Sequence, residues 1–193
     1  MKNAASLVFK YRSYTPLPFV LVMFLFQEAT VLSMISGFII VLAGEFFRIW
    51  GVSYAGSETR TTGSVGGSYL VVTGAFAYVR NPLYLGNILI YIGVGIMSMA
   101  FFPYLQLLAL IFFYIQYRII IHEEEAYLKE TFGKEFESYR KSVGRFIPRL
   151  FPYKNNIIEQ PGYNLKAGLR SEKRTLQAIS AVTLILIILT IAK

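Results

Sequence analysis

Two short polar clusters hold the side chains whose types and spacing suit chemistry. The first is Arg80-Asn81-Pro82-Leu83-Tyr84, which follows a loop rich in glycine and serine and begins an apolar segment. The second is His122-Glu123-Glu124-Glu125, which ends the next apolar segment. An arginine and hydroxyl donors at a helix N-terminus suit a carboxylate or a phosphate, and nearby carboxylates can accept hydrogen bonds from an amine or hydroxyls. We therefore expect the two clusters to meet at one face of a membrane and to form one site.

Each residue of the first cluster also has a purely structural explanation. Pro82 suits the first turn of a helix, because its missing N–H needs no partner there, and Asn81 would cap the same helix. Arg80 could instead bind lipid headgroups, and Tyr78 and Tyr84 could belong to the belt of aromatic residues at a membrane interface. Taken singly, the residues leave both explanations open. Taken together, they also describe a pocket for an anion.

In the second cluster, Glu124 has the surroundings that most require a partner. Its neighbours three and four positions away on a helix are largely apolar: Ile120, Ile121, Tyr127 and Leu128. A carboxylate on such a face is costly unless it is paired, and the candidate partners are Arg118, Arg80 or a ligand with an amine or hydroxyls. Glu125 is interpreted as part of a solvated run of charge. His122 is interpreted as an interfacial histidine, with a role as general base as the alternative.

A third group consists of Tyr139, Arg140 and Arg145, which follow the acidic cluster. One interpretation is a basic surface strip that lies on anionic lipid. The other is a wall of the same pocket that neutralises charge on a substrate. The residues alone leave both open. Further upstream, Glu45 and Arg48 are one helical turn apart and could pair at the membrane interface.

The composition places these clusters in a membrane protein. The chain has 193 residues, which suggests one domain, or one domain and a tail. It is 55% hydrophobic and 16% charged, with a mean hydropathy of +0.51, and its apolar residues form long uninterrupted blocks. The net charge of +8 lies in the polar segments, which favours contact with anionic headgroups over binding of nucleic acid. Without cysteine and with a single histidine, the sequence predicts no metal site.

The apolar blocks predict an all-α, polytopic fold with about five transmembrane helices. Residues 17–26 are too few to cross about 30 Å as a helix, so this block extends into its flanks or enters as half of a hairpin. Residues 31–50 can span the bilayer. Residues 83–102 and 104–121 form a tight hairpin whose polar ends fall on one side. Residues 175–192 are just long enough for a last span.

The polar segments between these blocks are expected to differ. Residues 122–139 continue as an amphipathic helix outside the bilayer, because acidic residues precede lysines by four positions. Residues 143–153 are basic, aromatic and broken by proline, so they lie along the headgroup surface. Residues 51–68 are either a flexible linker or an ordered ligand loop, and residues 155–174 are interpreted as loop. The basic residues place this end of the protein in the cytoplasm.

Two stretches carry a resemblance to a known family. GAFAYVRNPLYLGN, a membrane hairpin and then HEEEAYLKETFGKEFESYRKSVGRFIPRL are similar to the isoprenylcysteine carboxyl methyltransferase and phospholipid methyltransferase superfamily of integral membrane enzymes. The resemblance covers residues 70–150. It implies a membrane methyltransferase domain at 1–153, followed by a polar linker and a C-terminal transmembrane helix at 154–193. It also implies a pocket for S-adenosylmethionine on the cytoplasmic face.

The resemblance implies roles for the residues at matching motif positions. The implied cofactor contacts are Ser68, Tyr69, Leu70, Val71, Phe76, Arg80, Asn81, Pro82, Leu83, Tyr84 and Glu124. The implied catalytic residues are Arg118, Glu124 and Tyr84, and the implied substrate contacts are Arg118, Tyr139 and Arg145. The family's eukaryotic carboxyl methyltransferases have histidine where this chain has Asn81, and arginine where it has Ile120. The resemblance therefore supports methyl transfer more than it supports a prenylcysteine substrate.

Our first hypothesis is an integral membrane enzyme that transfers a methyl group from S-adenosylmethionine to a lipophilic acceptor. The acceptor would be a membrane lipid or prenylated molecule, such as a prenylcysteine carboxylate or a phospholipid amine. The chemistry requires mainly alignment of the reactants, exclusion of water and removal of a proton from an amine. The alternatives are an NADPH-dependent membrane reductase of the sterol-reductase type, and a non-enzymatic membrane scaffold or small transporter. Few ionisable residues interrupt the spans, mainly Glu28 and Glu45, which weighs against a transport path.

Overall fold

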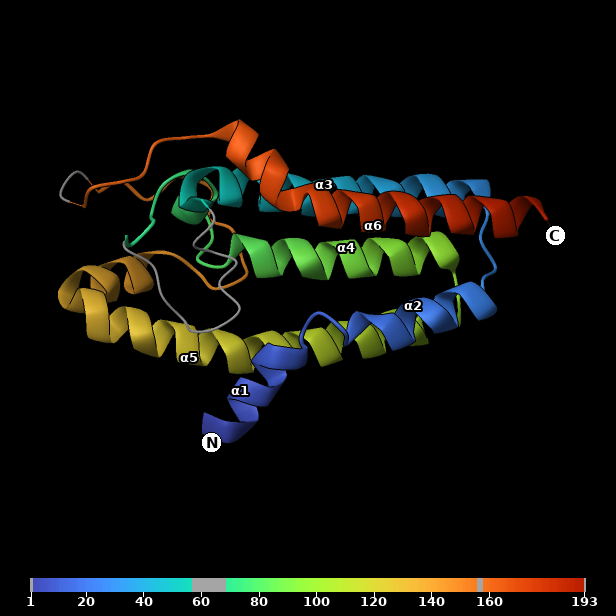
Figure 1. Cartoon of the computed structure of the whole chain (residues 1–193), viewed down its shortest axis with the longest axis horizontal. Coiled ribbons are helices and arrows are strands. Elements are labelled where there is room, and N and C mark those ends of the chain that lie inside the picture. Colours follow the sequence, from blue (N-terminus) through green and yellow to red (C-terminus); the bar gives the residue numbers. More distant parts are fainter. Residues whose placement is uncertain (1, 57–68, 156–157, 193) are drawn as a thin grey trace.

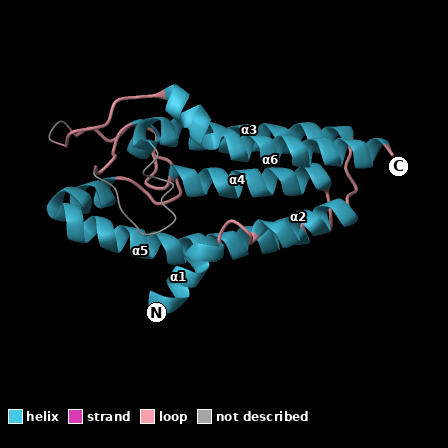
Figure 2. Ribbon diagram, in the orientation of Figure 1, coloured by secondary structure: helices cyan, strands magenta, loops and turns pink. Residues whose placement is uncertain are grey.

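The protein is built from helices joined by loops, and the computed structural model describes residues 2–56, 69–155 and 158–192 (Figure 1). Its α-helices are α1 (Lys2–Tyr11), α2 (Pro16–Leu25), α3 (Val31–Ala55), α4 (Pro82–Ser98), α5 (Tyr104–Ser142) and α6 (Leu165–Ile191), with a short 3₁₀ helix, η2 (Gly74–Ala77). The described residues contain no strand (Figure 2). The prediction of an all-α fold is confirmed.

Three helices, α3, α5 and α6, are long and apolar enough to cross a membrane. The helices α2 and α4 are also apolar but have 10 and 17 residues, fewer than the roughly 20 that a span requires. All five lie along a common axis (Figure 1). These features confirm the prediction of a polytopic helical membrane protein.

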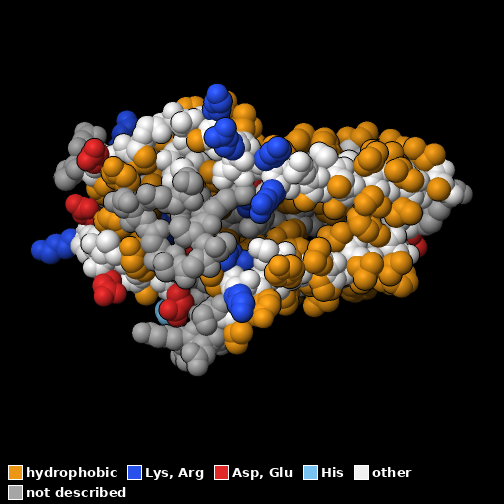
Figure 3. All heavy atoms as spheres, viewed as in Figure 1, with side chains coloured by type: hydrophobic (Ala, Val, Ile, Leu, Met, Phe, Trp, Pro, Cys, Tyr) orange, Lys and Arg blue, Asp and Glu red, His pale blue; other side chains and the backbone are white. Residues whose placement is uncertain are grey.

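The surface of the molecule divides along this axis. Hydrophobic side chains cover one half, whereas Lys, Arg, Asp and Glu gather over the other half and at the boundary (Figure 3). Large apolar side chains are exposed on four different helices of the apolar half, among them Leu21, Ile39, Leu108 and Ile188. A surface of this extent is unfavourable in water and suits lipid. The apolar half is therefore the part that lies in the bilayer.

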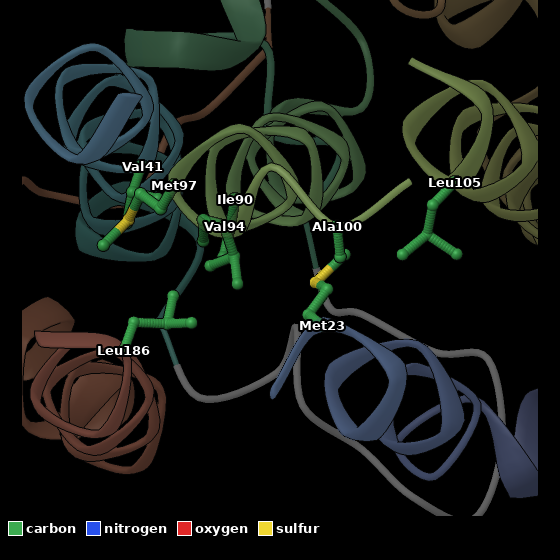
Figure 4. Close-up of a cluster of buried hydrophobic side chains, with 8 residues drawn as sticks. All are labelled: Met23, Val41, Ile90, Val94, Met97, Ala100, Leu105 and Leu186. Atoms are coloured by element: carbon green, nitrogen blue, oxygen red, sulfur yellow. The ribbon is translucent and has the colours of Figure 1, made fainter. Parts of the chain in front are cut away.

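The helix α4 occupies the centre of the bundle. It lies between a layer formed by α3 and α6 and a layer formed by α2 and α5 (Figure 1). Side chains from three of these helices meet beside it, because Met23 of α2, Val94 of α4 and Leu186 of α6 belong to one buried cluster (Figure 4). This packing fixes the level at which the first turn of α4, with Tyr84, sits in the bundle.

Pairs of glycines allow α3 and α4 to approach closely. A methyl group added at Gly93 would lie 2.7 Å from the carbonyl oxygen of Gly37, and one added at Gly44 would lie 2.6 Å from the carbonyl oxygen of Gly86. Both separations are shorter than van der Waals contact, so only glycine fits. Small residues are the common means by which membrane helices pack backbone against backbone. The contact explains why α4 is held most tightly against α3.

Several element boundaries differ from the predictions. The predicted helical continuation of residues 104–121 into 122–139 is confirmed, because both lie in one helix, α5, although this helix runs on to Ser142 and is kinked at Gly133 (φ 49°). The prediction of a loop over residues 155–174 is wrong from Leu165 onward. The helix α6 begins there because the Asn164 side chain accepts a hydrogen bond from the backbone N–H of Ala167 and caps the first turn. The helix α3 continues to Ala55 and α4 ends at Ser98. The division into units 1–153 and 154–193 stays a prediction.

Candidate active site

The two polar clusters meet where the first turn of α4 faces α5. The Tyr84 hydroxyl donates a hydrogen bond to Oε1 of Glu124 at 2.6 Å. The ring of Tyr84 also packs against the ring of Tyr117, with 4.7 Å between centroids, so the hydroxyl is held in place. Glu124 therefore has the partner that its apolar helix face requires, although neither Arg118 nor Arg80 supplies it.

A cavity of about 960 Å³ contains this contact in its wall. Its polar end is formed by the segment before α4 and by α5, and its other end continues between apolar side chains of α2, α4 and α6. Ten of the predicted cofactor contacts line it: Tyr69, Leu70, Val71, Phe76, Arg80, Asn81, Pro82, Leu83, Tyr84 and Glu124. Ser68 lies outside the described residues. Tyr139, a predicted substrate contact, also lines the cavity, whereas Arg118 and Arg145 do not.

The environment of Glu124 shifts the pKa of its carboxyl toward neutral pH. Burial raises the pKa of this carboxyl to about 7, whereas the hydrogen bond from Tyr84 and the charge of Arg12 oppose the rise. The position is outside the apolar part of α5, beside the cavity. A carboxyl with such a pKa can take up or release a proton near neutral pH, which is what a general base or acid must do.

The interpretation of Glu125 as a solvated residue is wrong. Its side chain is buried, forms an ion pair with Arg80 Nη2 at 3.1 Å and accepts a hydrogen bond from Arg145 Nη2 at 2.6 Å. Successive residues of a helix point about 100° apart, so Glu124 faces Tyr84 while Glu125 faces the two arginines. The hydrogen bonds to Glu125 raise the pKa of Arg145. Residues 76–84, which precede and begin α4, form a polar hinge. Glu125 braces this hinge, through Arg80, against Arg145 in the segment that follows α5.

The segment after α5 wraps the hinge with backbone hydrogen bonds. The N–H groups of Arg149 and Tyr153 donate to the carbonyl oxygens of Tyr78 and Ala77 at 3.0 and 2.8 Å. The Tyr139 hydroxyl donates to the carbonyl oxygen of Phe76 at 2.7 Å, and burial raises the pKa of this phenol, so it stays a donor. Tyr139 of the third group therefore supports the hinge from behind.

Arg118 does not join the site. It is exposed on α5 and lies over the ring of Tyr114, 5.9 Å from its centroid. His122 is exposed as well. The helical phase explains both positions, because α5 directs Tyr117, Ile120 and Ile121 into the bundle and the residues between them outward.

Gln160 is a contributor that no sequence pattern indicated. Its Oε1 accepts from the backbone N–H of Val72 at 2.8 Å and from the Thr73 hydroxyl at 3.1 Å, and its Nε2 donates to the carbonyl oxygen of Leu70 at 3.0 Å. One side chain thereby satisfies three groups of the segment that forms the polar end of the cavity. A lone glutamine in a polar loop carries no signal of such a role.

A second buried polar cluster lines the cavity farther along α3. Arg48 Nη2 donates to Glu172 Oε2 at 2.6 Å, and Arg48 Nη1 donates to the side-chain oxygen of Asn87. Arg48 Nε lies 3.7 Å from Glu45, the pairing predicted from their spacing, and both residues are buried in the bundle. The contact to Glu172 anchors α6, and sequence spacing could not indicate it because the partners lie far apart in the chain.

Comparisons with known proteins show which family the chain is similar to. A family model described as phospholipid methyltransferase matches residues 32–135, which is more than half of the chain. The protein-S-isoprenylcysteine O-methyltransferase of Saccharomyces cerevisiae is 30% identical over 131 residues, which cover 65% of this chain and 53% of that protein. The enzyme of the same name from Schizosaccharomyces pombe is 37% identical over 79 residues, covering 41% of this chain and 33% of that protein.

A third relative has a different name. The cobalt-zinc-cadmium resistance protein CzcN of Cupriavidus metallidurans is 31% identical over 107 residues, which cover 55% of this chain and 45% of that protein. The chain spans about half the length of these relatives, or less. The similarities confirm the superfamily resemblance that the hinge and the acidic cluster predicted, and the matched region begins at residue 32, well before the hinge.

Proposed function

The chain belongs to the phospholipid methyltransferase family, and from this premise we propose that it is an integral membrane methyltransferase that uses S-adenosylmethionine and acts on a lipophilic acceptor. The observation that carries the proposal is the contact between Tyr84 and Glu124 in the wall of a cavity that is polar at one end and apolar at the other. Such a cavity suits a charged nucleoside beside the head of an amphiphile.

The donor set at the polar end fits the proposed cofactor. Its carboxylate suits the N-terminus of α4 and the nearby arginine, its amine and ribose hydroxyls suit the Glu124 carboxylate, and its adenine suits the apolar and aromatic surfaces of Leu70 and Phe76. The cofactor would be held by the segment 69–71, by Phe76 and by hinge residues 80–84. Gln160 supports Leu70 of the first segment, and Tyr139 supports Phe76.

When bound, the cofactor supplies an activated methyl group on a sulfonium, so the protein has to do little covalent work. The cavity walls hold the reacting groups in line and exclude water. Where the acceptor is an amine, Glu124 accepts the proton that nitrogen loses, because its pKa of about 7 allows it to be ionised at neutral pH. Tyr84 holds the Glu124 carboxylate toward the cavity. The exposed position of Arg118 gives no support to a catalytic role for it.

The acceptor is proposed to be a membrane lipid or a prenylated molecule. The yeast relatives are named for isoprenylcysteine and the family model for phospholipids, and the apolar end of the cavity accommodates a hydrocarbon chain of either kind. The catalytic end is proposed to face the cytoplasm. This assignment is supported by the basic residues that gather at the boundary of the apolar half (Figure 3).

The test is isothermal titration of the detergent-purified chain with S-adenosylhomocysteine and, separately, with NADPH. We expect S-adenosylhomocysteine to bind, and Tyr84→Phe and Glu124→Ala each to weaken binding about tenfold or more, the usual effect of losing a hydrogen bond to a charged group. Tyr104→Phe is the matched control, because Tyr104 is 77% exposed at the start of α5, outside the cavity. Binding of NADPH alone would favour a reductase, and binding of neither compound would favour a scaffold.

A further inference from the structure

The cavity reaches the lipid-facing surface between α2 and α6. Along its apolar part the lining comes from both helices: Pro16, Leu17, Val20, Met23, Ala178, Ile179 and Val182. Leu17 lines the cavity and is nevertheless 59% exposed, so the wall at this point is also part of the outer surface in the apolar half. An amphiphile in the bilayer can therefore place its hydrocarbon chain along this part without crossing the polar end.

Arg12 stands where this apolar part begins. It lies on the turn between α1 and α2 and lines the cavity together with its neighbour Ser13. Its Nη1 donates to the carbonyl oxygen of Phe9 at 2.7 Å, and the guanidinium lies over the Phe9 ring, 3.7 Å from the centroid. These contacts fix the orientation of a long side chain that would otherwise be mobile.

Arg12 forms no ion pair within 4 Å among the residues that the structure describes, and most of its N–H donors are open to a ligand. An arginine has five N–H donors, and one of those of Arg12 has a partner among the residues that the structure describes. The other arginines of the same wall differ, since Arg48 pairs with Glu172 and Arg80 pairs with Glu125. Arg174 of α6 also lines the cavity and forms no ion pair with a described residue. The cavity wall thus carries Arg12 beside α2 and Arg174 on α6.

The position of Arg12 favours the acceptor over the cofactor as its ligand. The proposed cofactor contacts come from the segment 69–71, from Phe76 and from the hinge, whereas Arg12 continues into the wall formed by α2. Arg12 nevertheless lines the same cavity as Tyr84 and Glu124. A head group bound at Arg12 would therefore share the cavity with the contact between Tyr84 and Glu124, while its hydrocarbon chain follows α2 and α6.

We propose that Arg12 determines acceptor specificity by binding an anionic group, a phosphate or a carboxylate, in the head of an amphiphile whose chain lies between α2 and α6. Arg174 adds a second positive charge to the wall of the same cavity. Guanidinium groups suit both anions because they offer two parallel donors to two oxygen atoms. This inference rests on the proposed function, and it names a residue outside the region matched by the family model.

The test uses three ligands with one farnesyl tail, each titrated into the detergent-purified chain with and without saturating S-adenosylhomocysteine. Farnesyl phosphate carries a phosphate, N-acetyl-S-farnesylcysteine carries a carboxylate, and the methyl ester of the latter carries neither. The variants are Arg12→Ala and Arg12→Lys. Lys10→Ala is the matched control. Lys10 carries the same charge two positions before Arg12, but it is exposed and does not line the cavity.

We expect Arg12→Ala to weaken binding of the anionic ligands about tenfold or more and to leave binding of the methyl ester and of S-adenosylhomocysteine unchanged. Arg12→Lys should weaken binding of the anionic ligands less than Arg12→Ala does, because it keeps the charge and loses the planar fork. Lys10→Ala should change none of these affinities. The anion that binds the original chain more tightly identifies the head group.

Three outcomes would overturn the inference. Equal weakening of the acid and its methyl ester would assign Arg12 a packing role. Weakened binding of S-adenosylhomocysteine would assign Arg12 to the cofactor carboxylate, and unchanged binding of both anions would assign it no ligand. Failure of the proposed function looks different, because S-adenosylhomocysteine would then not bind the original chain, whereas the farnesyl ligands are still titrated in its absence.

Discussion

The interior of the bundle and the polar end of the cavity are each organised around an arginine in an ion pair, but in different surroundings. In the interior, Arg48 pairs with Glu172 at 2.6 Å, and Glu172 is fully buried. At the polar end, Arg80 pairs with Glu125 at 3.1 Å, and Glu125 is shared with Arg145, whose side chain is 30% exposed. Arg80 also donates to the backbone carbonyl oxygens of residues 140 and 143, each at 2.5 Å.

Both clusters depend on residues from outside the region that the family model matches. Each cluster recruits a side chain from outside residues 32–135, namely Glu172 from α6 and Arg145 from the segment after α5. Other residues outside that region, among them Tyr139 and Ala178, line the cavity, so the region matched by the family model does not complete the cavity wall by itself. Because water reaches one side of the polar cluster and is excluded from the interior cluster, breaking a charge pair should cost more in the interior.

The largest effect is expected from Arg48→Met. This change removes the contact of Arg48 with the buried carboxylate of Glu172, which should lower the free energy of unfolding in detergent by about 3–5 kcal/mol. The control is Lys129→Met, which removes an ion pair to Glu137 in which the lysine is 60% exposed, and should have no detectable effect. Similar losses for the two variants would contradict the distinction between buried and exposed pairs. The measurement is equilibrium unfolding followed by circular dichroism.

A smaller loss is expected where α3 and α4 touch. In Gly93→Ala the added methyl group would lie 2.7 Å from the Gly37 carbonyl oxygen, so the helices must separate, at a cost of about 1–3 kcal/mol. Gly162→Ala makes the same change where the methyl group meets no atom within 4 Å. A shift in the unfolding midpoint for the first variant and none for the second would confirm that the interior depends on close approach.

At the polar end, Glu125→Gln should cost about 1–2 kcal/mol, because Arg145 can be solvated and Arg80 keeps its backbone carbonyl partners. The brace on the hinge weakens, so the affinity for S-adenosylhomocysteine should also fall severalfold. A loss of stability as large as that of Arg48→Met would show that the two clusters do not differ in the way their exposure indicates. Titration calorimetry and equilibrium unfolding of the same sample give both quantities.

The last expected effect is a pH dependence from Glu124, whose pKa burial raises to about 7. Because the carboxyl ionises at lower pH in the unfolded chain, its contribution to stability should decline as pH rises from about 4.5 to 7 and then level off. Tyr84→Phe removes a hydrogen bond that lowers this pKa, so the levelling should move to higher pH. Glu124→Gln should abolish this component. Thermal unfolding from pH 5 to 8 measures it, and an unaltered profile in Glu124→Gln would assign the dependence to another group.

Much of the fold and part of the site follow from the sequence. The apolar blocks predicted helices that the structure contains, and the apolar face around Glu124 required a partner, which Tyr84 supplies. The first ten residues of α6 were missed, because their charged and polar side chains resemble a loop in isolation. They form a helix in the structure, where Glu172 is buried against Arg48 and Asn164 caps the first turn. A residue's partner far away in the chain leaves no local pattern.

The sequence by itself determined that apolar helices would alternate with a basic hinge and an acidic cluster, because long apolar segments must be helical in lipid to satisfy their own backbone groups. Only the tertiary structure decided that Glu124 contacts Tyr84 whereas Glu125 braces the hinge through Arg80. Glu124 and Glu125 are chemically identical and point about 100° apart on one helix. Their roles are set by where the packing of α4 against α5 places Tyr84 and Arg80.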